Sequence, residues 1–205
     1  MLQENLINVQ AKIDAALARQ HRKKKLTGNK VTLVAVTKNH PAEVITDAFN
    51  LGVPVIGENR VQEAKAKREI VGKGSGRWHL IGHLQTNKAK QAVAIFDMIE
   101  SADSVHLMQA VDKEAAKAGK VQEILLQVNI AREEQKTGFS PEDYEAVVPE
   151  LDNFKNLHVR GLMVIAPAAE KFRRYTLGVC GRLQALLQTE TAAPGYRYSF
   201  HGHDA

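Results

Sequence analysis

Apolar segments rich in β-branched residues alternate with helical patterns through most of this 205-residue chain. Such alternation is typical of consecutive βαβ units, in which each helix crosses over so that the next strand lies parallel to the last. The strand segments are continuous apolar runs, which indicates a sheet covered on both faces, either an open doubly wound sheet or a closed barrel. The predicted strands are 31–37, 53–57, 78–82, 98–101, 123–130 and 159–165, and the predicted helices between them are 41–51, 61–70, 88–96, 104–118 and 141–151.

Two features mark the ends of predicted helices. A loose 3.6-residue repeat of apolar residues predicts an opening amphipathic helix that ends near Thr27-Gly28-Asn29. Ser140 followed by Pro141 is typical of a helix start, with serine as the N-cap and proline at the first helical position. Six strands are recognisable, whereas a complete (β/α)8 barrel needs eight.

The composition excludes several classes of protein. No apolar stretch approaches the roughly 20 residues that cross a bilayer, and residues 1–5 lack the parts of a secretory signal, so we expect a cytoplasmic protein without a membrane partner. Cys180 is the only cysteine, which excludes an internal disulfide and a thiolate metal cluster. The net charge is +5, but the basic segment 19–25 suits a helix end and has no interleaved aromatic residues, so we expect no nucleic-acid partner.

Lys38 follows the apolar run of the first predicted strand and is the strongest candidate for chemistry. A lysine surrounded by apolar side chains loses hydration of its charged form, so its pKa falls and the neutral amine can form a Schiff base with a carbonyl compound. The alternative is a structural lysine whose side chain extends to solvent at the end of the strand.

Polar residues also follow the other predicted strands, at the edge where the carboxyl ends of parallel strands meet. In a barrel, this edge collects the catalytic and binding groups. Each residue also has a structural explanation, since Ser101 can cap a helix and His83 can be a hydrogen-bonded structural histidine. The residues at this edge are Lys38, 58–60, 83–88, Ser101, Asn129 and 163–167.

Two other patterns suggest sites of different chemistry. His79 and His83 are four residues apart, like paired zinc ligands on a helix, but they flank a predicted strand and no carboxylate nearby in the sequence completes a metal site. The glycine-rich segment 72–77 lacks the spacing of a phosphate-binding P-loop and precedes a strand rather than a helix. We therefore expect no metal, and the absence of GxGxxG and GxSxG motifs argues against a dinucleotide enzyme and an α/β hydrolase.

Several motifs follow one another along the chain: Val34-Ala35-Val36-Thr37-Lys38, Gly57-Glu58-Asn59-Arg60-Val61-Gln62-Glu63, Trp78-His79-Leu80-Ile81-Gly82-His83-Leu84-Gln85-Thr86-Asn87-Lys88, Gln127-Val128-Asn129 with Lys136-Thr137-Gly138, and Gly161-Leu162-Met163. Together they resemble the pyridoxal phosphate homeostasis protein family, the single-domain relatives of the alanine racemase barrel domain. The resemblance runs from the opening helix to about Pro167. It implies an α/β fold, a TIM-type (β/α)8 barrel of the alanine racemase N-terminal domain type. It also implies that pyridoxal 5′-phosphate (PLP) is held as a Schiff base on Lys38, in a pocket lined by Asn59, His83, Ser101, Asn129 and Met163.

The end of the chain departs from this resemblance. Members finish with a Ser-Met-Gly-Met-Ser/Thr motif and an Arg-Ile-Gly strand, which supply the last two barrel strands and much of the phosphate site, and neither is present. Phe200-His201-Gly202-His203-Asp204 is what Ser-Met-Gly-Met-Thr becomes when its codons are read one base out of register. We therefore hypothesise a frameshift near Tyr198 and an incomplete barrel that lacks its last two strands; the hypothesis requires Ser-Met-Gly-Met-Thr in the adjacent frame of the gene. The alternative is a metal site of His201, His203 and Asp204, which a terminal tail disfavours.

The resemblance implies one barrel domain over residues 1–205, family-like to about 167 and divergent from 168 to 205. We expect a monomeric protein of intracellular PLP homeostasis, with amino acids or keto acids as further partners and without robust catalysis of its own. One alternative is a PLP-dependent amino-acid racemase of fold type III, which needs two acid/base groups on opposite faces of the cofactor. Lys38 supplies one, and we expect too few residues after Pro167 for the separate domain that supplies the other. A further alternative is a truncated product with impaired PLP binding.

Overall fold

A computed structural model of the chain describes residues 2–20, 31–72, 74–130, 132, 136–165 and 197–201, with the backbone alone for residues 19, 20 and 197–201. These residues contain one parallel sheet of seven strands, whose order in the sheet is also their order in the chain. The strands are β1 (Val34–Val36), β2 (Val55–Glu58), β3 (Arg77–Leu80), β4 (Met98–Ala102), β5 (Gln122–Gln127), β6 (Leu157–Ile165) and β7 (Arg197–His201).

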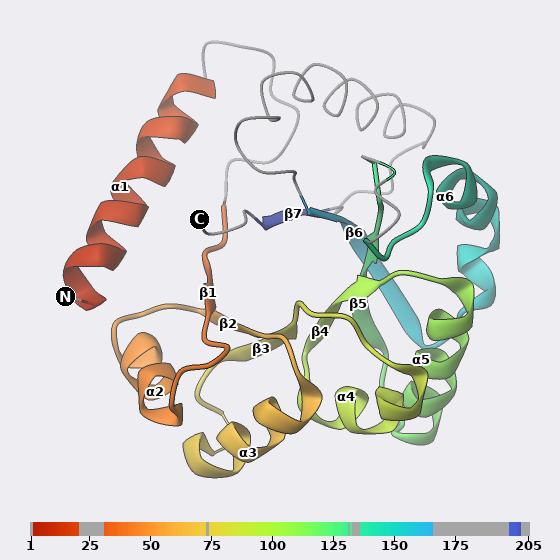
Figure 1. Ribbon diagram of the computed structural model, residues 1–205, viewed down its shortest axis with the longest axis horizontal. Helices are drawn as coiled ribbons and strands as arrows, with labels where there is room; N and C mark the ends of the chain where they lie inside the picture. The colour runs from red at the N-terminus through yellow and green to blue at the C-terminus, as the bar shows by residue number, and fades with distance from the viewer. Residues whose placement is uncertain are drawn as a thin grey trace.

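Helices connect the strands and cover one face of the sheet. Figure 1 shows α2 to α6 around the outside of the curved sheet, with α1 at the left of the view. The helices are α1 (Leu2–Gln20), α2 (Ala42–Asn50), α3 (Val61–Val71), α4 (Ala89–Ile95), α5 (Val105–Lys117) and α6 (Pro141–Val147), with 3-10 turns η1 (Thr86–Lys88) and η2 (Val148–Asn153). The predicted alternation of strands and helices is confirmed.

The structure confirms the fold class and adds one strand to the six recognised in the sequence. β7 pairs parallel with β6 in the register from Gly161 opposite Arg197 to Ile165 opposite His201. Among the described residues, the barrel is therefore incomplete as predicted, but it has seven strands rather than the six expected from a barrel without its last two, and β1 and β7 lie at the two ends of the sheet. Tyr198 and Phe200 alternate with polar residues in β7, but the unfamiliar sequence of this tail concealed the strand from sequence reasoning.

The start of α6 agrees with its prediction, whereas its end does not. The hydroxyl oxygen of Ser140 accepts a hydrogen bond from the amide of Asp143, and Pro141 occupies the first turn. The α-helix ends at Val147 rather than continuing to residue 151, and the chain continues as the 3-10 turn η2. Pro149 lies in this turn and has no amide hydrogen, so it cannot extend an α-helical hydrogen-bond ladder.

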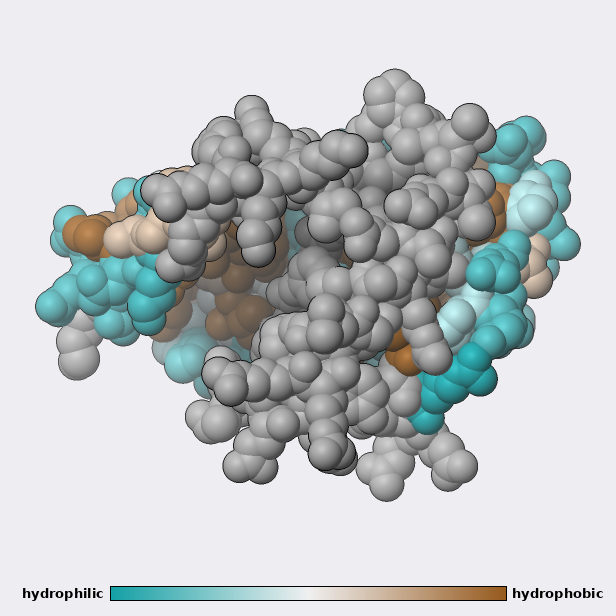
Figure 2. Space-filling view, turned by 90° about the horizontal axis from the view of Figure 1, so that it is seen from above, coloured by the Kyte–Doolittle hydropathy of each residue, from teal (hydrophilic) through white to brown (hydrophobic). Residues whose placement is uncertain are grey.

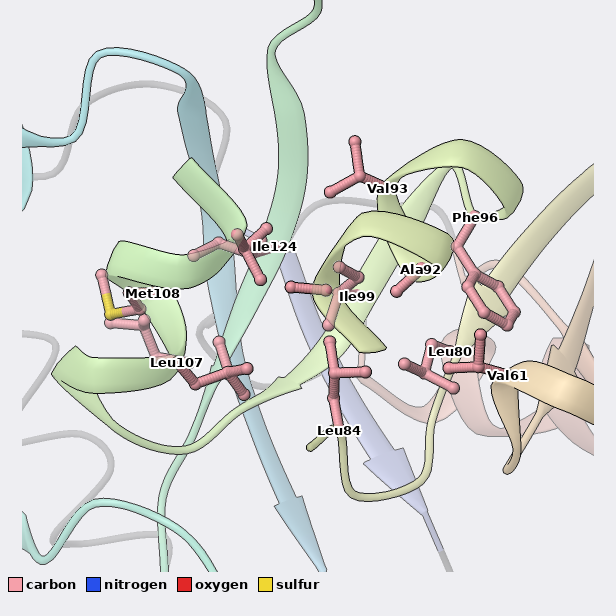
Figure 3. Packing of buried hydrophobic residues seen from close by; sticks show 14 of the residues in the cluster. Val61, Leu80, Leu84, Ala92, Val93, Phe96, Ile99, Leu107, Met108 and Ile124 are labelled. Atoms are coloured by element: carbon pink, nitrogen blue, oxygen red, sulfur yellow. The ribbon is translucent and has the colours of Figure 1, made fainter. Parts of the chain in front are cut away.

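Buried apolar side chains form two clusters on opposite faces of the sheet. The larger cluster joins strands to helices, and Figure 3 shows Leu80 and Ile99 from β3 and β4 together with Val61, Phe96 and Leu107 from the helical side. The smaller cluster contains Met98, Leu125 and Met163, which neighbour outward-facing residues in their strands. Because successive side chains of a strand point to opposite faces, the smaller cluster lies inside the barrel.

The prediction that the first strand is buried and spans residues 31–37 is wrong. β1 covers only Val34–Val36, and Val36 has an exposed fraction of 43%. β1 ends the sheet and pairs with β2 alone, so one of its edges has no strand neighbour among the described residues.

The predicted opening helix is confirmed as far as Gln20, and its predicted end near 27–29 and most of the basic segment 19–25 lie outside the described residues. Leu2, Ile7 and Val9 are exposed, Ile7 by 62%. Figure 2 shows the corresponding mixture of hydrophobic and hydrophilic surface on its left side, where α1 lies. None of the helices in the described part of the chain combines the length and apolar character needed to span a membrane.

Candidate functional site

The candidate site lies at the carboxyl-terminal edge of the sheet and starts with the turn that carries Lys38. The amide of Thr37 continues the β1–β2 pairing by donating to the carbonyl of Gly57 at 3.0 Å. The amide of His40 then donates back to the carbonyl of Thr37 at 3.1 Å, which closes a tight turn around Lys38. Asn39 has a φ of 62°, in the left-handed region that only a minority of non-glycine residues adopt.

Lys38 itself is exposed, so the expectation that apolar side chains surround it is wrong. The reason is the position of β1, which is short, half-buried and at the end of the sheet. Its neighbour Thr37 is buried, with an exposed fraction of 2%, so the backbone of the turn is enclosed while the lysine side chain is accessible. The geometry therefore presents an accessible amine on a fixed backbone.

A buried ionic cluster lies directly behind this turn, between β2 and α3. Nζ of Lys67 lies 2.7 Å from Oε1 of Glu58 and 2.7 Å from Oε1 of Glu63. The hydroxyl of Thr37 donates to the same oxygen of Glu58 at 2.6 Å. The pKa of the Glu63 carboxyl lies below its ordinary value, chiefly because Lys67 donates a hydrogen bond to it.

Asn59, Gly82 and Ser101 are brought together where β2, β3 and β4 end. The hydroxyl of Ser101, which is fully buried, donates to the carbonyl of Gly82 at 2.7 Å. A side chain at Gly82 would place a Cβ 2.4 Å from the carbonyl oxygen of Asn59, so only glycine permits this approach of the two backbones. Ser101 does not cap a helix; it fixes the end of the neighbouring strand segment instead.

His83 follows Gly82 and is exposed on the same edge. Its Nδ1 lies 2.9 Å from Oδ2 of Asp103, whose side chain is largely buried. The carboxylate orients the imidazole ring, because one ring nitrogen is fixed by this contact while the other remains for a different partner. Sequence reasoning missed Asp103, which is 20 residues away in the chain.

Asn129 is half-buried just after β5, and residues 136–139 lie against it. The amide group of Asn129 donates to the carbonyl of Lys136 at 3.0 Å, and its backbone amide donates to the carbonyl of Phe139 at 2.9 Å. Gly138 has a φ of 132° and approaches the backbone of Asn129 closely. The Lys136-Thr137-Gly138 motif thus holds Asn129 in place.

Met163 is the innermost of the predicted site residues. It has no exposed surface and belongs to the cluster inside the barrel with Met98 and Leu125. The structure therefore brings Lys38, Asn59, His83 and Asn129 to the rim, and it buries Ser101 and Met163 beneath it.

The two histidines considered as zinc ligands each meet a carboxylate from β4 or the residue after it. Nδ1 of His79 lies 2.6 Å from Oε1 of Glu100, and both side chains are buried. These carboxylates are distant in the sequence, which is why the sequence search for a nearby partner missed them. Within the described ranges, no group of three or more His, Cys, Asp or Glu side chains is arranged to hold a metal ion. His203 and Asp204 lie outside those ranges, as does the side chain of His201.

A cavity of about 370 Å³ lies beside this edge, between α6 and the start of α5. Asp103, Gly138 and Glu150 are among its lining residues, whereas Lys38, Asn59 and His83 are not. The candidate site is therefore the rim around Lys38 rather than this cavity.

Comparison with known families agrees with the fold. Residues 13–198 match the family described as alanine racemase, N-terminal domain. This match extends beyond Pro167, where the recognisable motifs end. The pyridoxal phosphate homeostasis protein of Aquifex aeolicus is 37% identical over 167 residues, which are 82% of this chain and 72% of that protein. That of Pseudomonas aeruginosa is 32% identical over 185 residues, which are 90% of this chain and 78% of that protein.

Solved structures give the same result. PipY of Synechococcus elongatus PCC7942 with PLP bound has a TM-score of 0.76 and 31% identity, covering 98% of both chains. An alanine racemase of Clostridium difficile 630 has a TM-score of 0.69 at 12% identity, covering 85% of this chain and 47% of the racemase, and it supports the fold alone.

Proposed function

The chain belongs to the pyridoxal phosphate homeostasis protein family, which has the fold of the alanine racemase N-terminal domain, and on this premise we propose that it binds PLP covalently through Lys38. The observation that carries the proposal is the accessible amine of Lys38 on a backbone turn that is enclosed on the other side. A relative that covers 98% of this chain was solved with PLP bound.

The chemistry of the rim residues fits the aldehyde end of PLP. An aldehyde needs a primary amine that can reach it, and Lys38 supplies one at the rim. Asn59, His83 and Asn129 add side chains that donate and accept hydrogen bonds around a polar aromatic molecule. Residues 166–196 and 202–205 lie outside the described residues.

Ser101 and Met163 act in this proposal from below the pocket. Ser101 fixes the carbonyl of Gly82. Gly82 lies against the backbone of Asn59 and precedes His83, so this hydrogen bond helps to hold both residues in place. Met163 forms part of the apolar floor inside the barrel. The other four predicted residues would contact the cofactor directly.

We propose further that the protein stores and transfers PLP rather than converting a substrate. PLP supplies an electrophilic carbon that exchanges between amines, and an exposed Lys38 leaves it open to an incoming amino acid. The relatives from Aquifex aeolicus and Pseudomonas aeruginosa are named for PLP homeostasis, whereas the racemase matches the fold alone. We place this role in the cytoplasm, with a monomer as the acting form and with amino acids or keto acids as the exchanging partners; size-exclusion chromatography with light scattering tests the monomer.

The experiment compares the wild type with Lys38→Ala and with Lys90→Ala, which removes an exposed lysine from α4. Each protein is mixed with PLP, treated with borohydride to fix any imine, and digested for mass spectrometry. We expect PLP on the Lys38 peptide of the wild type and of Lys90→Ala, and none on the Lys38→Ala protein. Labelling of other lysines only, with Lys38 unmodified, would exclude the proposed site.

A second measurement separates storage from racemisation. L-alanine is added to the PLP-loaded protein, and the alanine is analysed on a chiral column. We expect release of PLP to the amino acid without accumulation of D-alanine. Steady formation of D-alanine that depends on Lys38 would support the racemase alternative, and a wild type that binds no PLP would support the impaired product.

A further inference from the structure

Lys67 has a fully occupied hydrogen-bonding environment that the proposed function leaves unexplained. Its ammonium group donates to the carbonyl of Thr37, to Oε1 of Glu58 and to Oε1 of Glu63, each at 2.7 Å. An ammonium group has three N–H donors, so these acceptors use all of them. The side chain of Lys67 is only 8% exposed, and that of Glu58 is fully enclosed.

The three acceptors converge on the residues that flank Lys38. Lys67 holds the carbonyl of Thr37, the residue before the lysine. Glu63 accepts a hydrogen bond from the backbone amide of Asn39, the residue after it, at 2.8 Å. One ionic pair on α3 therefore fixes the backbone on both sides of the reactive residue.

The backbone conformation of Asn39 is strained, and the hydrogen bond to Glu63 helps to hold it. Asn39 is left-handed, which is uncommon for a residue with a side chain, although asparagine tolerates it better than most. Strained residues persist where the surrounding structure determines their conformation, and they concentrate at functional sites. The hydrogen bond from the backbone amide of Asn39 to Glu63 helps to hold Asn39 in this conformation.

We propose that Lys67, together with Glu58 and Glu63, is a positioning group that sets the direction in which the side chain of Lys38 points from the end of β1. The cluster lies on the helix side of β2 and bonds to the backbone of Thr37 and Asn39. PLP held by Lys38 would lie at the rim, so the cluster would act through the backbone of residues 37–39 rather than through a contact with the cofactor. The inference rests on the proposed function, since positioning Lys38 matters for function only if PLP forms a covalent bond with it.

The central test uses Glu63, because removing Lys67 leaves the enclosed carboxylate of Glu58 without its cation and endangers folding. Glu63→Ala removes the acceptor for the amide of Asn39, and Glu63→Gln retains an acceptor oxygen. We expect Glu63→Ala to weaken covalent retention of PLP about tenfold, the usual effect of losing a hydrogen bond to a charged group, and Glu63→Gln to recover most of it. Retention is measured by PLP titration and by borohydride labelling of the Lys38 peptide.

Two control variants separate positioning from general stability. Glu69→Ala removes an exposed glutamate from the same helix. Asp112→Ala removes a carboxylate on α5 that accepts the backbone amide of Asn156 at 2.8 Å, far along the chain from Lys38. We expect both to retain PLP like the wild type, even where Asp112→Ala lowers the melting temperature as much as Glu63→Ala does. Equal loss of PLP in Asp112→Ala and Glu63→Ala would overturn the inference, and so would full retention in Glu63→Ala.

Amide hydrogen exchange in the PLP-free protein distinguishes this inference from the function on which it rests. We expect the amide of Asn39 to exchange at least about tenfold faster in Glu63→Ala than in Glu69→Ala, because its acceptor is gone. If the wild type binds no PLP while Asn39 shows this acceleration, the backbone clamp stands and the proposed function fails. If exchange at Asn39 is unchanged, the clamp itself is refuted.

Discussion

Glu63 is a carboxylate on α3 that helps to fix the backbone of the turn after β1. It accepts hydrogen bonds from Lys67 and from the amide of Asn39, and its pKa is lowered mainly by the bond from Lys67, against the opposing effect of burial. Glu63 and Lys67 are four residues apart, a spacing that places both on one helix face. This spacing is the sequence signal that identifies the pair, but it does not reveal that Thr37 and Asn39 are their partners.

The lowered pKa gives a pH prediction. A carboxyl whose pKa is lower in the folded state stabilises the fold above its unfolded pKa, and this contribution disappears as the pH falls through the folded pKa. We expect the difference in unfolding free energy between the wild type and Glu63→Gln to be constant above about pH 5 and to shrink below it. Urea unfolding from neutral to acidic pH measures it, with Glu69→Gln as the control on the same helix. A difference that grows toward acidic pH would contradict the assignment.

Residue types and strand-end positions identified most of the candidate site, because the carboxyl ends of parallel strands share one edge. Lys38, Asn59, His83 and Asn129 all reach that edge. The degree of burial was not predictable, since it depends on the neighbours of each strand: Val36 in the edge strand β1 is exposed, whereas Met163 in β6 is fully enclosed. The roles of the six residues toward PLP remain predictions.

At the scale of elements, Gly82 determines how closely the ends of β2 and β3 approach. We expect Gly82→Ala to destabilise the protein by at least about 2 kcal/mol, because its Cβ would meet the rigid backbone of Asn59 at 2.4 Å. The same change should weaken PLP retention by moving Asn59 away from the rim. Thermal unfolding and PLP titration check the two effects.

Gly52→Ala is the matched control for this substitution. Gly52 has a φ of 85° and open space around it. Alanine there would make no clash, and its only cost would be the left-handed backbone conformation, about 1 kcal/mol of stability. PLP retention should be unaffected. If Gly82→Ala proves no more harmful than Gly52→Ala, the close backbone contact is not important.

Element boundaries show which sequence signals are reliable. The helix starting after Ser140 was predictable because serine and proline have direct chemical roles at a helix start. Strand β7 was not recognised, because its local pattern of five residues is short and its partner, β6, is distant in the sequence. The frameshift hypothesis for the tail stays a prediction that the gene sequence tests.

At the scale of the whole molecule, the cluster between sheet and helices contains most of the buried apolar residues in the part of the chain that the structure describes. Ile99 in β4 is fully buried within it, whereas Ile70 on α3 has an exposed fraction of 70%. We expect Ile99→Ala to cost about 2 to 5 kcal/mol and Ile70→Ala less than about 0.5 kcal/mol in unfolding free energy. Denaturant unfolding of the two variants measures the difference, and similar losses in both would show that the cluster is not the core.

The order of the strands in the sheet has a consequence for the timing of assembly. The described groups that fix the backbone around Lys38, from the carbonyl of Gly57 to the ammonium of Lys67, lie between residues 37 and 67. A polypeptide emerging from a ribosome therefore contains all of these groups before the more distal half of the sheet has been translated. Lys38 and the groups that fix the backbone beside it are therefore encoded in one contiguous segment, upstream of strands β3 to β7.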